Sequence, residues 1–133
     1  MDLKNIGTTK ETTSVTLYHP VTSEALLNDD NTEMTITVHG PYSKKYKALS
    51  NSQGNRRLQK AQRTGGKMNL TVEEIEASSM ELLVKCVSAW NVTLDGEQPD
   101  CKEAKVREVF ESMPWLKEQV DAAVGDAQAF LET

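Results

Sequence analysis

The side chains that could do chemistry are two histidines and one short acidic run. His19 and His39 could meet across paired strands and bind a metal, but the sequence offers no further ligand at a zinc-binding spacing. We therefore expect two histidines that flank turns. Asp29, Asn31 and Glu33 alternate as in a calcium loop, yet the glycine and the closing glutamate of such a loop are missing. A hairpin turn explains this run better.

The two cysteines also have ordinary explanations. Cys86 lies on the apolar face of a predicted helix, which indicates core packing. Cys101 follows a predicted capping residue, where a helix N-terminus would lower the thiol pKa, but no histidine lies near it in sequence to act as a base. The chain has no phosphate-binding loop, dinucleotide fingerprint, serine-hydrolase elbow or zinc-protease motif. We expect no catalytic residue, no metal and no cofactor, and so not an enzyme.

The N-terminal third has the alternation of β-strands. Residues 14–18 and 33–39 each place apolar side chains on one face, and residues 25–27 could add a short edge strand. Asn28–Asn31 predicts a turn, because Asn and Asp tolerate left-handed backbone and bond their own main chain. Residues 14–41 therefore predict a small antiparallel hairpin or sheet, whose apolar face must pack on another element.

The remaining two thirds predict helices. Residues 43–63 favour helix but have a thin apolar stripe, so we expect this helix to be partly exposed, or broken around Gly54. Thr71 with Glu74 forms a capping box, which predicts a helix over 71–90. Its apolar face is predicted to hold Ile75, Leu82, Leu83, Cys86, Val87 and Trp90.

Two further helices are predicted near the C-terminal end. Asp100 with Glu103 makes a second capping box, which predicts a helix to Met113. Pro114 suits the first turn of the last helix. The predicted fold is α+β, with an N-terminal small antiparallel β-hairpin or sheet followed by a bundle of three to four α-helices.

A single domain over residues 14–133 is expected after a flexible arm at residues 1–13. Within the domain, the β-hairpin region spans 14–41, the basic helix and hinge span 42–67, and the helical region spans 68–133. No apolar run approaches the roughly 20 residues that span a bilayer, and the first residues lack a signal-peptide core. We expect a cytosolic protein that does not bind membranes.

The charge is unevenly distributed along the chain. The net charge is −5, yet residues 43–67 carry eight bases and no acid. Such a block suits docking onto an acidic protein or a second copy of the chain, which we favour; a solvated helix is the next alternative. Nucleic acid is the weakest alternative, because the rest of the chain is acidic.

The candidate partner-binding residues combine this block with the large apolar residues of the C-terminal region. The favoured interpretation of the three large apolar residues Trp115, Phe130 and Leu131 is that they pack in the core. The second interpretation is that they line a groove for a helix of another protein. The full candidate set is Lys44, Lys45, Lys47, Arg56, Arg57, Lys60, Arg63, Trp115, Phe130 and Leu131.

Several stretches resemble a known family of small proteins. They are Val15–Pro20 (VTLYHP), Leu26–Asp30 (LLNDD), Met34–Pro41 (MTITVHGP), Ala89–Gly96 (AWNVTLDG) and Pro114–Asp121 (PWLKEQVD), with the likeness ending near Phe130 and Leu131. Together they resemble the tail assembly chaperones that tailed bacteriophages and prophages encode beside the tape-measure gene.

The resemblance implies a partner and a place of action. Such a chaperone would bind the tape-measure protein in the cytoplasm of the bacterial host. A second copy of the chain is a further candidate partner, so a homo-oligomer is one expectation. It would be displaced by the tail tube protein as the tube polymerises, and would not remain in the virion. The alternative is a structural component of the tail or head–tail joint, and a nucleic-acid-binding regulator is a distant third.

Overall fold

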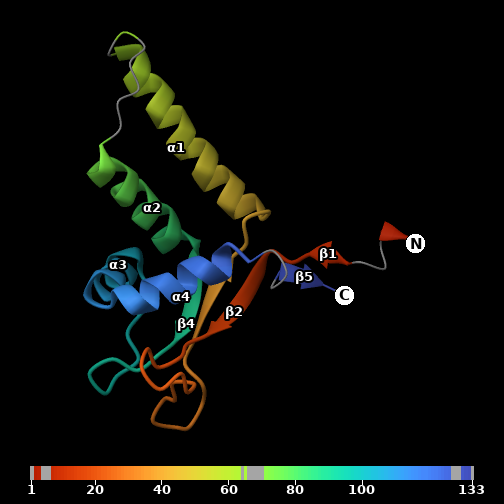
Figure 1. Ribbon diagram of the computed structural model, residues 1–133, viewed down its shortest axis with the longest axis vertical. Helices are drawn as coiled ribbons and strands as arrows, with labels where there is room; N and C mark the ends of the chain where they lie inside the picture. Colours follow the sequence, from red (N-terminus) through yellow and green to blue (C-terminus); the bar gives the residue numbers. More distant parts are fainter. Residues whose placement is uncertain (1, 4–6, 64, 66–70, 127–129, 133) are drawn as a thin grey trace.

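The fold is α+β, as the sequence predicts. The computed structural model describes residues 2–3, 7–63, 65, 71–126 and 130–132 (Figure 1). A three-stranded sheet and a pair of helices make the body, and two further helices project from it as an arm (Figure 1).

The sheet is antiparallel, with the order β2-β3-β4. Its strands are β2 (Thr12–Thr16), β3 (Thr35–His39) and β4 (Val87–Asn91). The predicted apolar face of the hairpin is confirmed, because Ile36 and Val38 of the central strand are fully buried. The predicted turn is confirmed as well: Asn31 has a φ of 67°, and the Asp30 carboxylate accepts from the Thr32 amide and hydroxyl.

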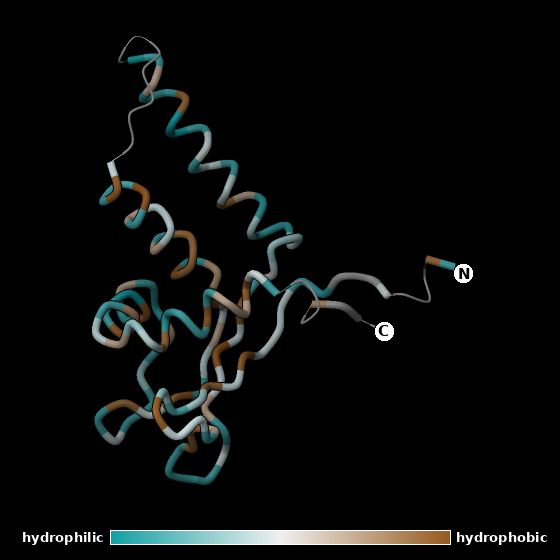
Figure 2. The backbone as a smooth tube through the Cα atoms, viewed as in Figure 1, coloured by the Kyte–Doolittle hydropathy of each residue, from teal (hydrophilic) through white to brown (hydrophobic). Residues whose placement is uncertain are grey.

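The helices are α1 (Lys44–Arg63), α2 (Val72–Cys86), α3 (Glu103–Ser112) and α4 (Pro114–Val124). The last two pack on the sheet and on each other, with Val106, Phe110 and Val120 almost completely buried. Figure 2 shows hydrophobic positions in the body and along α2, whereas α1 is hydrophilic along most of its length. The core therefore lies between the sheet and the α3–α4 pair.

A short ribbon joins the two ends of the described chain. Strand β1 (Thr8–Thr9) pairs antiparallel with β5 (Leu131–Glu132) and extends away from the body (Figure 1). Residues 1–13, predicted as a flexible arm, thus contain β1 and the first two residues of β2.

The predicted helix over residues 71–90 is wrong at its C-terminal end. Thr71 does cap α2, its hydroxyl accepting from the Glu74 amide at 3.1 Å, but the helix ends at Cys86. Val87 then adopts extended geometry and begins β4, in which Trp90 lies opposite Ile36. The spacing of the apolar residues fits a helix, but β-branched and aromatic residues also favour a strand, and pairing with β3 decides between the two.

Two smaller helix predictions also differ from the structure. Helix α3 begins at Glu103 after an extended Lys102, so Asp100 caps nothing; the Pro99 carbonyl instead accepts from the Trp90 indole at 2.8 Å. Ile75, predicted on the apolar face of α2, is half-exposed. Helix α1 is continuous through Gly54, and Pro114 opens α4 as predicted.

Candidate partner-binding surfaces

The histidines and acidic residues do not assemble a metal centre. His19 Nδ1 accepts from the amides of Val21 and Thr22 at 3.1 and 3.2 Å, which makes it a turn cap, whereas His39 ends β3. In the part of the chain that the structure describes, no group of three His, Cys, Asp or Glu residues could hold a metal ion.

Burial makes both thiols poor nucleophiles. Cys86 is completely buried, and desolvation raises its pKa to about 11. Burial also raises the pKa of Cys101, the opposite of the effect expected at a helix N-terminus, because α3 begins two residues further on. Both thiols are therefore protonated at neutral pH.

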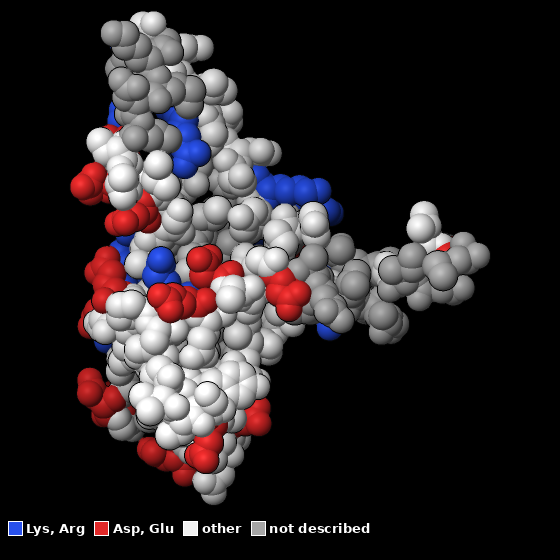
Figure 3. Space-filling model, viewed as in Figure 1, with Lys and Arg blue, Asp and Glu red and all other residues white. Residues whose placement is uncertain are grey.

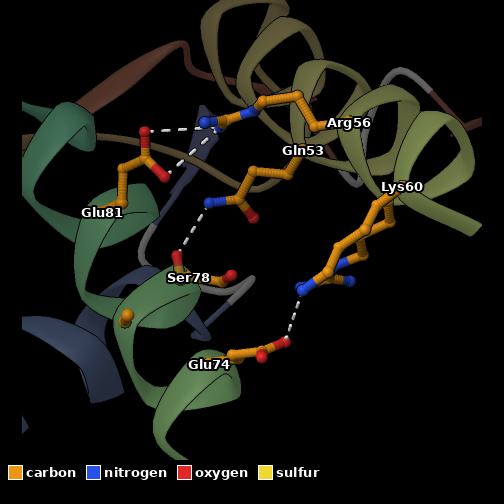
Figure 4. Close-up of a pocket in the computed structure, with 8 residues that line it drawn as sticks. Gln53, Arg56, Lys60, Glu74, Ser78 and Glu81 are labelled. Atoms are coloured by element: carbon orange, nitrogen blue, oxygen red, sulfur yellow. Dashed lines mark hydrogen bonds and ion pairs between the residues drawn. The ribbon is translucent and has the colours of Figure 1, made fainter. Parts of the chain in front are cut away.

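The basic block meets the acidic face of α2 within the same chain. Arg56 pairs with Glu81 and Lys60 with Glu74, each at 3.3 Å, and Gln53 Nε2 donates to the Ser78 carbonyl at 2.8 Å (Figure 4). These contacts line a polar cleft of about 330 Å³ between the two helices. Because the ion pairs are exposed to water, each contributes at most about 1 kcal/mol.

The bases at the start of α1 lie apart from this cleft. Lys44, Lys45 and Lys47 are in the first turn of α1, whereas Arg57 lines the cleft with Arg56 and Lys60. Arg63 is the last residue of the helix. At 1.5 Å per residue, Lys47 and Arg56 are separated by about 14 Å along the helix. Of the residues of α1, all of which the structure describes, only Ala61 is buried. The predicted basic surface thus divides into two patches, one of which faces α2.

An apolar hollow of about 60 Å³ is lined by residues of the sheet, of the loops after β2 and β4, and of the start of α4. Figure 1 shows these loops at the end of the molecule away from the arm. Leu17 and Ile36 are buried at its base, whereas Trp115 and Met113 remain partly exposed. Leu27 and Tyr18 stay about half exposed beside its lining residues. The hollow is lined by Leu17, Leu26, Met34, Ile36, Trp90, Val92, Thr93, Leu94, Val109, Met113, Trp115 and Leu116.

Acidic residues surround this hollow. Its lining residues lie within segments 17–36, 90–94 and 109–116. These segments and the turn at 95–97 carry no Lys or Arg, and Lys117 follows directly after the last of them. In Figure 3 the loop end of the molecule is an uncharged area with Asp and Glu at its margins. The acidic residues of the three segments are Glu24, Asp29, Asp30, Glu33, Asp95, Glu97 and Glu111.

The three apolar candidates from the sequence have different environments. Trp115 contributes to the hollow, and Phe130 is 1% exposed, so its ring belongs to the core. Phe130 lies against Gly40, where an added Cβ would come within 2.6 Å of the ring. Leu131 is in β5, opposite Thr9. Trp115 therefore lies at an open apolar surface, whereas Phe130 does not.

Sequence reasoning missed most of the hollow. Leu94 and Met113 gave no signal by themselves, because each belongs to a short apolar run that also fits a core. A signal that could have found them is the absence of Lys and Arg from segments 17–36, 90–97 and 109–116, all of which contain acidic residues. Comparisons of the chain with protein-family models, with curated proteins and with solved structures gave no match. No helix in the described part of the chain has the length and apolar character needed to cross a bilayer.

Proposed function

We propose that this protein is a phage tail assembly chaperone, which covers the tape-measure protein until the tail tube polymerises around it. The open apolar hollow at the loop end carries the proposal, together with the resemblance described above. A chaperone of this kind needs a place where an apolar side chain of a partner helix can rest and then leave.

The hollow has properties that suit reversible binding. It is shallow enough to take part of a partner's side chain, and its exposed wall is made by Met113 and Trp115 rather than by charged groups. Methionine adapts its shape to different apolar partners, and tryptophan supplies a large contact area. Contact confined to so small an area favours fast release, which displacement by the tail tube protein requires.

Co-expression with the tape-measure protein tests this function. The wild-type chain is expected to move the tape-measure protein from the pellet to the soluble fraction. The double variant Leu94→Gln/Met113→Gln is expected to lose most of this effect, because it places amides in the hollow. Leu58→Gln is the matched control, since Leu58 is half-exposed on α1, away from the hollow.

Two results would contradict the proposal. One is a tape-measure protein that stays insoluble with the wild-type chain across several lengths of tape measure. The other is detection of the chain at stoichiometric amounts by mass spectrometry of purified virions, which would identify it as a structural component. Thermal unfolding of both variants shows whether a loss of effect reflects unfolding.

A further inference from the structure

We propose that the hollow at the loop end binds a cationic amphipathic helix, with one apolar side chain in the hollow and lysine or arginine side chains on either side. This inference rests on the proposed function for the same surface and specifies the partner's chemistry. It follows from the combination of an apolar centre and an acidic margin.

The apolar centre defines the contact residue of the partner. A volume of about 60 Å³ accommodates part of an aliphatic side chain such as leucine or methionine. The wall of the hollow is almost wholly apolar, so a polar side chain placed there would lose water without gaining hydrogen bonds. The occupant is therefore apolar.

The acidic margin defines what flanks that residue. Glu33 is exposed next to Met34, and Asp95 and Glu97 are exposed in the turn that follows Leu94. A partner with acidic flanks would bring like charges together, whereas lysine or arginine at these positions would be attracted. The helix spacing of three and four residues places such flanks beside an apolar stripe.

The basic block lies away from this margin. Seven of its eight bases lie in α1, and two of these, Arg56 and Lys60, are paired with α2. Figure 1 places α1 and the loops that line the hollow at opposite ends of the molecule. At a Debye length of about 8 Å in physiological salt, α1 has little influence there. The basic block therefore leaves the charge of the margin uncompensated, and Lys117, which follows Leu116, is the base that directly adjoins the lining segments.

Three synthetic helical peptides with one shared apolar stripe test the inference. Their flanking positions carry lysine and arginine, glutamine, or glutamate. In titrations of the ¹⁵N-labelled full chain, the cationic peptide is expected to bind roughly tenfold or more tightly than the acidic one, and less tightly in high salt. Shifts are expected at the indole signals of Trp90 and Trp115 and at Met113.

A pair of isosteric variants provides the matched control. Glu33→Gln/Glu97→Gln removes two charges at the margin and is expected to weaken the cationic peptide several-fold. Glu73→Gln/Glu76→Gln removes two exposed charges from the first turns of α2 and is expected to leave the affinity unchanged. Both variants keep the side-chain shape, and circular dichroism checks their folding.

The outcomes separate this inference from the proposed function. Equal affinity for the cationic and acidic peptides, no binding of any peptide, or equal affinity of the two variants overturns the inference. If the wild-type chain nevertheless solubilises the tape-measure protein, the proposed function stands. If the peptides follow the expected order and the tape-measure protein stays insoluble, the proposed function fails and the hollow serves another cationic helix.

Discussion

The side-chain amide of Gln119 makes two hydrogen bonds with the backbone of Tyr18. Its Oε1 accepts from the Tyr18 amide at 2.9 Å, and its Nε2 donates to the Tyr18 carbonyl at 2.8 Å. The glutamine thus takes the place of a neighbouring strand just after β2. It fastens α4 to the loop that follows Leu17, and so holds together two of the segments that line the hollow.

Replacing Gln119 should loosen this attachment. Gln119→Ala removes both hydrogen bonds and is expected to lower the free energy of unfolding by about 1 kcal/mol. The amide of Tyr18 should exchange faster with solvent, which hydrogen exchange followed by NMR measures directly. Glu118→Ala, at the exposed neighbouring position, should change neither quantity; equal effects of the two variants would contradict the assigned role.

Gly40 is expected to reject any larger side chain. In Gly40→Ala the new methyl group would lie 2.6 to 3.0 Å from ring carbons of Phe130, so we expect a loss of about 1–3 kcal/mol in denaturant unfolding. Phe130→Leu in the same chain should recover part of the loss. Gly54→Ala is the control, because its site is open and helical, and it should stabilise by up to about 1 kcal/mol.

Asn28 joins the loop after β2 to the end of β4. Its Nδ2 donates to the carbonyls of Thr32 and Asn91, and its Oδ1 accepts from the Thr93 hydroxyl at 2.6 Å. Asn28→Asp replaces the donor with a carboxylate oxygen beside two carbonyls. We expect a loss of about 1–3 kcal/mol by urea unfolding. Asp29→Asn, at the exposed next residue, should stay within about 0.5 kcal/mol of the wild type.

His39 should make stability depend on mildly acidic pH. Burial first, and Lys45 second, lower its pKa in the folded chain, while Glu11 opposes them. The unfolded chain therefore takes up a proton at higher pH than the folded chain, so stability should fall as pH decreases below about 6.5. His39→Gln should flatten this slope, and Lys45→Gln should reduce it. An unchanged slope in His39→Gln, measured by urea unfolding at several pH values, would be inconsistent with this assignment.

The sequence predicted those helices and strands whose signals lie within a few neighbouring residues. The alternation of Met34, Ile36 and Val38 has a period that only a strand explains, and Thr71 with Pro114 marked helix starts through their own backbone chemistry. Trp90 was misassigned because a short apolar run fits both periods, and its partner Ile36 lies more than fifty residues away. Strand pairing between residues so far apart in the chain does not affect the spacing of apolar residues within either segment.

The candidate surfaces were harder to predict from the sequence, because they too are formed by residues that lie far apart along the chain. The basic block was visible as composition, but the acidic residues that meet it, Glu74 and Glu81, belong to another helix. Trp115 was recognised as a large apolar residue, whereas its position in the hollow depends on segments that converge only after folding. The composition of the sequence identified the charged and apolar residues, and the topology of the fold determined which of them are in contact.

Helix α2 passes into β4 without an intervening loop, since Cys86 ends the helix and Val87 begins the strand. The arm and the sheet therefore share one continuous piece of backbone. Trp90, which contributes to the hollow, is the fourth residue after Cys86. Because no loop lies between α2 and β4 to absorb a displacement, we expect a movement of α2 to be passed directly to β4 and to the side of the hollow that Trp90 forms.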